Sequence, residues 1–251
     1  MEIKLTGHSL LTIPKSHVLI KTTILSFFIR KFLMPKVKDG YFEEKRNEIL
    51  KSAFEVCKRK PAYELTMSDI VAETGLSQGG VYKYFDNIYS VFSALIDKAN
   101  LEGNHTSKID EIMNDDIPAE VKLEKLFLES ENFFSEMLLS YNKILYELST
   151  LCLQNPELDK KIKEKTSVKP VFPYLAHCVS ELIISQVKAG VFKPIIPVED
   201  ILTFIVSSFD GIIRDVTLNK CYNIQSEDIT VLDEKKLIHS LYISTLKLLG
   251  K

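Results

Sequence analysis

The polar side chains best able to form a recognition surface are concentrated in one short segment, residues 66–84. Hydroxyl, amide and ammonium groups recur there at close spacing, together with two adjacent glycines. Such groups form hydrogen bonds to phosphate oxygens, and a side-chain amide can bond the edge of an adenine in two places. The pattern therefore favours binding of nucleic acid over bond-making chemistry. The candidate residues are Thr66, Ser77, Gln78, Gly79, Gly80, Tyr82, Lys83 and Tyr84.

Two short helices joined by a tight turn would hold these groups in place. Thr66 and Asp69 have the spacing of a capping box, in which each side chain bonds the backbone N–H of the other at the start of a helix. Gly75 suits the left-handed conformation that ends this helix, and Ser77 is a favourable N-cap for the next one. The apolar residues that would pack the helices together are Ile70, Val71, Leu76, Val81 and Phe85. This is the arrangement of a helix-turn-helix DNA reader, whose helix N-terminus offers free N–H groups to phosphates.

The segment from Thr66 to Leu95, with a preceding helix through Ile49, Ala53 and Phe54, resembles the DNA-binding head of the TetR family of bacterial repressors. The similarity includes a Thr-x-x-Asp-Ile start, a Gly-Leu-Ser turn and a Gly-x-Val-Tyr-x-Tyr-Phe recognition helix. It extends over residues 41–103 and implies an all-α protein with a three-helix DNA-binding head. The remaining residues, 104–251, would form a larger helical domain for ligand binding and dimerisation.

One position departs from the family pattern. The family usually carries a lysine shortly after the last phenylalanine of the motif, where it contacts a phosphate, and here the residue is Ile88. A replacement contact would come from Lys83, Tyr84 or the N-terminal arm. The head has no basic excess either, because residues 41–100 contain eight Lys/Arg and nine Asp/Glu. Affinity for DNA would then depend on where individual charges are placed.

Residues 1–40 form an extension of unusual composition. Residues 3–38 contain seven Lys/Arg and no acidic residue. The apolar run at residues 18–29 is interrupted by Lys21 and is shorter than the roughly 20 residues that a membrane-spanning helix needs. It also lacks the cleavage site of a signal peptide. Two interpretations stay open: translation starts at Met34, or the extension is a basic arm that contacts DNA or a membrane surface.

Motifs for catalysis or metal binding are weak throughout the sequence. Four scattered cysteines argue against a zinc site or a disulfide framework and fit a reducing cytoplasm. Five isolated histidines include no His-x-x-x-His pair, and neither a nucleophile elbow nor a dinucleotide-binding glycine motif occurs. Ser-x-x-Lys patterns at Ser140 and Ser244 have no partner motif. We therefore expect a cytoplasmic protein that is not an enzyme and uses no metal or cofactor.

Two long apolar helices are predicted at residues 170–189 and 198–219. Their apolar residues occur on more than one face, so part of this surface could cover a second copy of the chain. The residues that could face such a partner are Ile183, Ile184, Val187, Phe204, Val206, Phe209 and Ile212. A twofold homodimer would present two heads to the half-sites of a palindromic operator in double-stranded DNA, about one helical turn or a multiple of it apart. The alternative is that these residues belong to the core of the monomer.

Aromatic and methionine side chains at helical spacing in the second domain usually form core, but they can also line a pocket between helices. The candidate ligand-binding residues are Phe134, Met137, Tyr141, Tyr146, Tyr174, His177 and Phe209. They favour a mostly apolar small-molecule effector, because methionine and aromatic rings adapt to varied apolar shapes.

Two functions remain open at this point. One is a ligand-responsive DNA-binding regulator, a repressor that a small apolar molecule releases from its operator. The other is a helical small-molecule-binding or scaffold protein that has lost sequence-specific DNA binding. Only Ile88 and the acidic head favour the second function.

Overall fold

A computed structural model describes residues 40–138, 140–222 and 232–251 of the chain. Within these ranges every regular element is a helix, which confirms the predicted all-α fold. The chain divides into two compact units, residues 1–45 and residues 46–251. The described part of the first unit is residues 40–45, and residues 41–45 are the beginning of the first described helix. The predictions for the N-terminal extension, including a start at Met34, lie outside the described residues.

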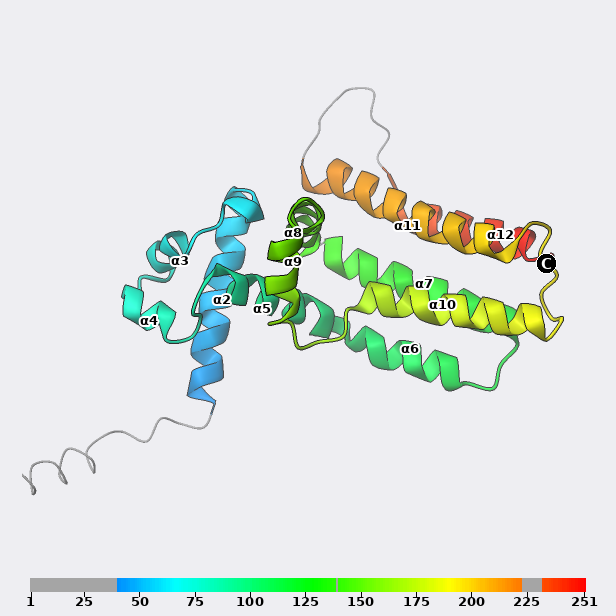
Figure 1. Cartoon of the computed structure of the whole chain (residues 1–251), viewed down its shortest axis with the longest axis horizontal. Helices are drawn as coiled ribbons and strands as arrows, with labels where there is room; N and C mark the ends of the chain where they lie inside the picture. Colours follow the sequence, from blue (N-terminus) through cyan, green and yellow to red (C-terminus); the bar gives the residue numbers. More distant parts are fainter. Residues whose placement is uncertain (1–39, 139, 223–231) are drawn as a thin grey trace, which may run out of the picture. The chain divides into compact units, whose positions relative to one another are not determined.

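The helices of the predicted DNA-binding head follow one another closely in the sequence (Figure 1). They are α2 (Tyr41–Arg59), the 3-10 turn η1 (Ala62–Glu64), α3 (Met67–Thr74), α4 (Gln78–Tyr82) and α5 (Ile88–Leu101). Apolar side chains from α2, α3, α4 and α5 are fully buried between them, among them Ile49, Ile70, Val81 and Val91. Burial of this shared apolar face stabilises helices that are too short to persist alone.

The caps predicted from the sequence are present at the helix ends. The backbone N–H of Asp69 donates to Thr66 Oγ1 at 3.2 Å, and the N–H of Thr66 donates to the Asp69 carboxylate at 2.8 Å. Gly75 ends α3 with a left-handed φ of 66°, which most residues avoid because of their Cβ. Ser77 then accepts from the N–H of Gly80 at 3.2 Å and starts α4. The capping box, the glycine stop and the second cap are therefore confirmed.

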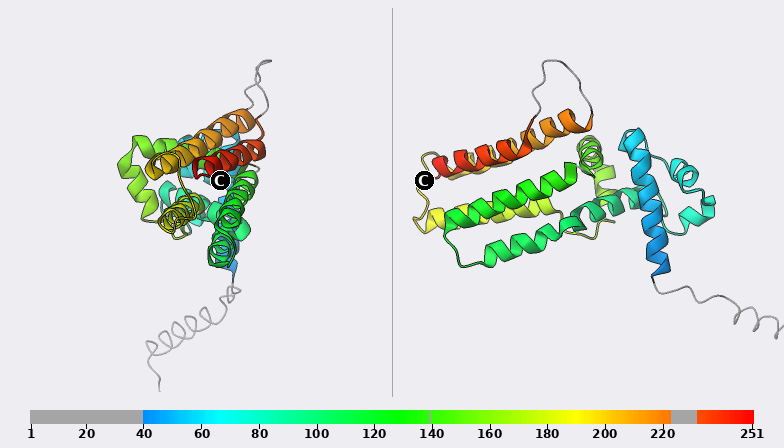
Figure 2. Two further views of the ribbon diagram at one scale, coloured as in Figure 1. Left: turned by 90° about the vertical axis from the view of Figure 1, so that its right-hand side faces the viewer. Right: turned by 180° about the vertical axis from the view of Figure 1, so that it is seen from behind.

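The second group of helices is longer. Its elements are η2 (Glu102–Asn104), α6 (His105–Asn114), α7 (Ala119–Leu138), α8 (Asn142–Gln154), α9 (Pro156–Lys163), α10 (Val171–Lys188), α11 (Val198–Cys221) and α12 (Glu234–Leu248). Helix α7 packs against α6, α10, α11 and α12, and Figure 2 shows these five helices running alongside one another. The helices predicted at residues 170–189 and 198–219 are confirmed as α10 and α11, with ends that differ by at most two residues.

The two groups of helices meet at a backbone break between α5 and α6. Gly103 has a φ of 72° and Asn104 a φ of 52°. A Cβ added to Gly103 would lie 2.2 Å from Nε2 of His105, so only glycine fits there. Residue 103 is also the predicted end of the head, and that domain boundary stays a prediction.

Candidate DNA-reading surface and ligand cavity

Helix α4 presents a polar surface to solvent because two apolar side chains fix its inner side. Val81 and Phe85 are fully buried, and the Arg46 guanidinium lies 4.4 Å from the centre of the Phe85 ring. Gln78 and Lys83 are exposed, and Tyr82 keeps 43% of its surface accessible. The structure therefore buries the side chains that the sequence pattern predicts to face inward and exposes those predicted to face outward.

The start of α4 is open to an approaching surface. A Cβ added to Gly79 would meet no atom within 4 Å, so packing inside the protein does not require glycine at this position. Ser77 and Thr66 are exposed caps, and Gly80 is partly covered by the Ser77 side chain. Free N–H groups at a helix start and a surface without side chains together suit a phosphate or the wall of a DNA groove.

Tyr84 differs from the other candidates because it is half-buried. Its carbonyl oxygen accepts from Arg46 at 3.3 Å, and the Lys83 ammonium lies 5.8 Å from the centre of its ring. Ile88, which replaces the family lysine, is also partly buried and packs against the core at the first residue of α5. Asn87 and Ser90 form the capping box of that helix. Packing, rather than a phosphate contact, thus accounts for the apolar residue at position 88.

A largely apolar cavity of about 400 Å³ lies among α5, α7, α8, α9, α10 and α11. Phe134, Met137 and Tyr146, three of the seven predicted ligand residues, line it. The other apolar lining residues are Ile96, Phe133, Leu145, Leu148, Cys152, Ile162, Pro170, Phe172, Pro173 and Ile213. The volume falls within the range of about 300–1,000 Å³ that is usual for sites of small molecules.

The other four predicted ligand residues lie elsewhere among the described residues. Tyr141 is buried with its ring centre 4.9 Å from that of Phe54 on α2, and burial raises its pKa to about 12. Tyr174 donates to Asp110 on α6. His177 is exposed. Tyr141 and Tyr174 therefore join helices, and His177 faces solvent, so none of the three lines the cavity.

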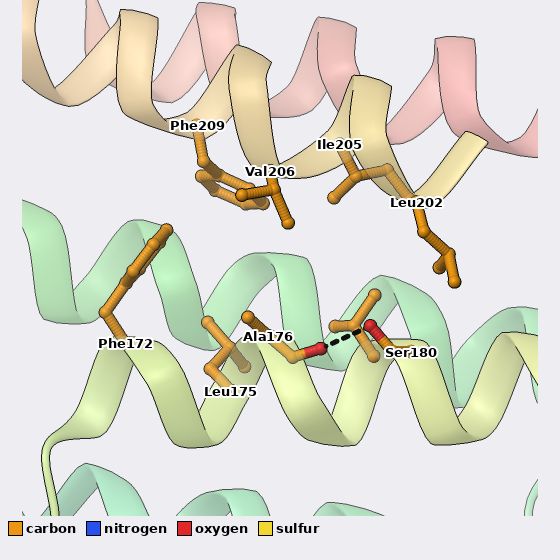
Figure 3. A pocket seen from close by; sticks show the side chains of 9 residues that line it. Phe172, Leu175, Ala176, Ser180, Leu202, Ile205, Val206 and Phe209 are labelled. Carbon is orange, nitrogen blue, oxygen red and sulfur yellow. Dashed lines mark hydrogen bonds between the residues drawn. The ribbon is translucent and has the colours of Figure 1, made fainter. Parts of the chain in front are cut away.

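Phe209, the last of the four, packs in the small space between α10 and α11. Figure 3 shows its ring beside Val206, across from Phe172 and Leu175 of α10. The space holds only about 10 Å³, so it is packed core and not a ligand site. Phe209 still bears on the larger cavity indirectly, because its ring centre lies 5.6 Å from that of the lining residue Phe172.

The residue that sequence reasoning most clearly missed is Asn100, on the helix that was assigned to the head. Asn100 lines the cavity, is 8% exposed and accepts from the backbone N–H of Val171 at 2.8 Å, which joins α5 to the start of α10. Ile96 lines the cavity one turn earlier on the same helix. A buried amide within the apolar run of α5 is the signal that could have indicated this contact.

A wider and more polar groove of about 800 Å³ adjoins the cavity. The two share Tyr146, Ser149, Cys152, Asp159, Lys163 and Ile213, so the apolar space opens into the groove along α8, α9 and α11. Lys163 lies 2.7 Å from Asp159, and Arg214 lies 2.8 Å from Asp215, both at exposed positions. The groove thus offers hydroxyl groups, two cations and the carboxylates of Asp159 and Asp210 beside an apolar space.

Part of the outer surface of α11 is apolar. Phe204 and Val206 each keep 40% of their surface exposed, whereas Ile183 is fully buried and Phe209 is 6% exposed. The monomer core therefore takes up some of the residues predicted to face a second copy, and the remaining apolar surface stays uncovered.

No helix among the described residues is long and apolar enough to cross a membrane. No group of metal-binding side chains occurs within those residues.

Comparisons with known proteins agree with this geometry. A family model for bacterial regulatory proteins of the tetR family matches residues 49–95. The uncharacterized HTH-type transcriptional regulator YfiR of Bacillus subtilis (strain 168) is 24% identical over 220 residues, which are 85% of this chain and 97% of YfiR.

Solved structures with the same fold include two regulators called FadR. The fatty acid degradation regulator FadR from Bacillus halodurans has a TM-score of 0.57 and 22% identity, with 80% of this chain and 94% of that chain covered. FadR from Bacillus subtilis, solved in complex with stearoyl-CoA, has a TM-score of 0.51 and 19% identity, with 80% and 96% covered. A segment that matches bacterial regulatory proteins, followed by a group of longer helices, is the architecture of a DNA-binding transcriptional regulator. The segment at residues 49–95 is thus similar to the DNA-binding segment of the TetR family, and the all-helical fold agrees with this similarity.

Proposed function

We propose that this protein is a dimeric repressor that an amphipathic small molecule, bound in the cavity, releases from a palindromic operator. The observation that carries the proposal is the position of α5. This helix starts six residues after the last residue of α4, and its residues Ile96 and Asn100 line the cavity. A molecule in the cavity would therefore contact a helix that continues from the DNA-reading surface.

The DNA-reading role is supported by the exposed polar side of α4. Gln78 is our candidate for base recognition, because its amide can bond an adenine edge in two places. Tyr82 and Lys83 would contact the groove or backbone beside it, with Thr66 and Tyr84 bonding phosphates. The exposed apolar side chains Phe204 and Val206 of α11 support a homodimer, which would carry two heads to two half-sites.

The chemical class of the effector is suggested by the join between the apolar cavity and the polar groove. An apolar chain in the cavity would leave its polar group beside Lys163 and Arg214. Because FadR of Bacillus subtilis was solved with stearoyl-CoA, long-chain acyl-CoA thioesters are the first probes to use. A ligand that prefers the DNA-free arrangement of the heads must weaken DNA binding by the same factor by which DNA weakens ligand binding.

DNA binding is tested first, with the purified full chain and a library of random-sequence duplexes. We expect repeated selection to enrich a palindromic sequence, and binding to that duplex to weaken steeply as salt rises, because phosphate contacts release counterions. A protein that enriches no sequence, or whose binding does not depend on salt, would be the helical binding or scaffold protein instead.

The effector is tested by thermal unfolding and by displacement of the selected duplex. Stearoyl-CoA at a hundred times its Kd should add about 2.7 kcal/mol to the free energy of unfolding and should also release the DNA. Free coenzyme A and stearate are the matched controls, since each retains one half of the molecule.

A second pair of variants locates the site. Ser149→Phe should block the join between cavity and groove and abolish the response to stearoyl-CoA, while Ser149→Ala should retain it. Stabilisation without release of DNA would mean that the cavity is not coupled to the head.

A further inference from the structure

Helix α8 forms a wall of the ligand cavity and also carries two charged side chains that reach the head. Its residues Leu145, Tyr146 and Leu148 line the cavity. Between them in the sequence, Glu147 has a side chain that is only 4% exposed, and Lys143 lies one turn earlier with its side chain 22% exposed. The Lys143 ammonium lies 3.0 Å from the Glu147 carboxylate. A buried carboxylate of this kind needs several partners to offset the loss of hydration.

The partners of this pair belong to the joint between α2 and η1. Lys143 Nζ donates to the carbonyl oxygens of Cys57 at 2.9 Å and of Lys60 at 3.3 Å. These carbonyls are at the C-terminal end of α2, where helix geometry leaves acceptors unpaired and favours a cation. Glu147 Oε2 accepts from the backbone N–H of Ala62 at 2.6 Å. Two side chains of α8 thus bind the backbone between α2 and η1: the Lys143 ammonium donates to two carbonyl oxygens, and the Glu147 carboxylate accepts from one N–H.

The joint leads directly to the DNA-reading helices. The Lys60 side chain donates to Asp69 at 2.6 Å, and Asp69 forms the capping box that starts α3. On the other side, Tyr222 at the end of α11 donates to Glu147 Oε1 at 2.5 Å. Burial and this hydrogen bond raise the pKa of Tyr222, so its hydroxyl remains a donor at neutral pH. One carboxylate therefore connects α8, the end of α11 and the start of the head.

We propose that Lys143 and Glu147 are positioning residues that fix the orientation of the DNA-binding head against the wall of the ligand cavity. They touch neither DNA nor ligand. Their effect is on the two heads of a dimer, which must be held at a set separation to bind two half-sites at once. The proposal rests on the proposed function, because it needs a dimer that reads a palindromic operator.

The test compares full-site and half-site DNA without any ligand. The full site is the palindromic duplex that the wild-type protein enriches, and the half-site duplex has one half scrambled. In Lys143→Met and in Glu147→Gln, affinity for the full site should fall by about tenfold or more, since two loosely held heads lose the benefit of simultaneous binding. Affinity for the half-site should stay within about twofold of wild type, because each head itself is intact.

Matched controls come from an exposed pair of the same residue types on α9. Glu157 and Lys161 also lie 2.9 Å apart at i and i+4, with side chains 77% and 46% exposed. Glu157→Gln and Lys161→Met should leave binding to both duplexes unchanged. Tyr222→Phe removes a single donor to Glu147 and keeps the ring, so it should give a smaller loss on the full site even if the variants of the charged pair fold poorly.

Three results would overturn the proposal. Equal weakening on the full site and the half-site would mean that the pair only stabilises the fold of the head. Unchanged binding to both duplexes in folded variants would mean that the pair does not position the head. A wild-type protein that enriches no palindrome would remove the proposed function itself, and this outcome is visible before any variant is made.

Discussion

The candidate DNA-reading surface and the candidate ligand cavity of this protein are built from contacts of very different sequence separation. The hydrogen bonds that start α3, α4 and α5 each join residues three apart, such as Thr66 with Asp69 and Ser77 with Gly80. The cavity instead takes its walls from six helices, between Ile96 and Ile213. A local surface of the first kind changes with single side chains, whereas a cavity of the second kind changes when helices shift.

The two regions are nevertheless joined through α5 and α8. Helix α5 contributes Ile96 and Asn100 to the cavity, and α8 contributes the Lys143–Glu147 pair to the head. A ligand in the cavity would therefore have two helices on which to act. Substitutions on α4 should therefore change which DNA sequence is bound. Substitutions in the helical domain should instead change the affinity for a full operator, which needs both heads of a dimer.

The largest effect is expected at the outer surface of α11. Phe204→Glu places a charge on an exposed apolar position, so a dimer that covers this surface should dissociate. Affinity for the full operator should then fall by roughly a hundredfold or more, because each head binds alone. Sedimentation velocity and DNA binding measure the two effects, and circular dichroism checks that the protein stays helical. Leu128→Glu, at a 52% exposed position on α7, is the control. A dimeric Phe204→Glu protein would move the interface elsewhere.

A substitution on α4 should impair the recognition of a base without changing the helical domain. Gln78→Ala should reduce discrimination at one base position by about 1–3 kcal/mol and leave the other positions unchanged. Binding to a set of operators with single base substitutions measures this. Equal weakening on every duplex would show that Gln78 contacts the backbone. The response to stearoyl-CoA should stay as in the wild type.

A third prediction concerns Ile88, the position that departs from the family pattern, where a lysine could add a contact to a DNA phosphate. Ile88→Lys restores a cation at the first residue of α5, so the dependence of log K on log salt should steepen by about 0.9 for each added phosphate contact. Ile88→Met, which keeps an apolar side chain, is the control and should leave the slope unchanged. An unchanged slope in Ile88→Lys would mean that this helix start does not approach the DNA backbone.

The smallest effect concerns acid stability of the head. Hydrogen bonds from Lys60 and Thr66 hold the pKa of Asp69 below its usual range. A carboxylate with a lowered folded-state pKa stabilises the protein above its unfolded value of about 3.9, and this contribution is lost as pH falls through the folded value. Asp69→Asn should therefore unfold more easily at neutral pH and differ less from the wild type in acid. Urea unfolding at several pH values tests this, with the exposed Asp116→Asn as control. A difference that is constant with pH would contradict the assignment.

The sequence predicted most of the helices, because hydrophobic periodicity and caps are local properties. Gly75 and Ser77 mark the turn before α4, and the ends of α10 and α11 lie within two residues of their predicted positions. The cavity was predicted less well. Aromatic periodicity identified Phe134 and Tyr146, but it equally selected Tyr174, which faces α6 instead.

The sequence by itself therefore determined the helical fold, the turn of the head and the side of α4 that faces outward, since neighbouring residues decide each of these. Only the tertiary structure decided that α5 lines the cavity, that Tyr141 packs on α2 and that Glu147 bonds the N–H of Ala62, 85 residues away. The physical reason is that helical periodicity fixes which residues share a face, whereas the crossing of helices decides what each face meets.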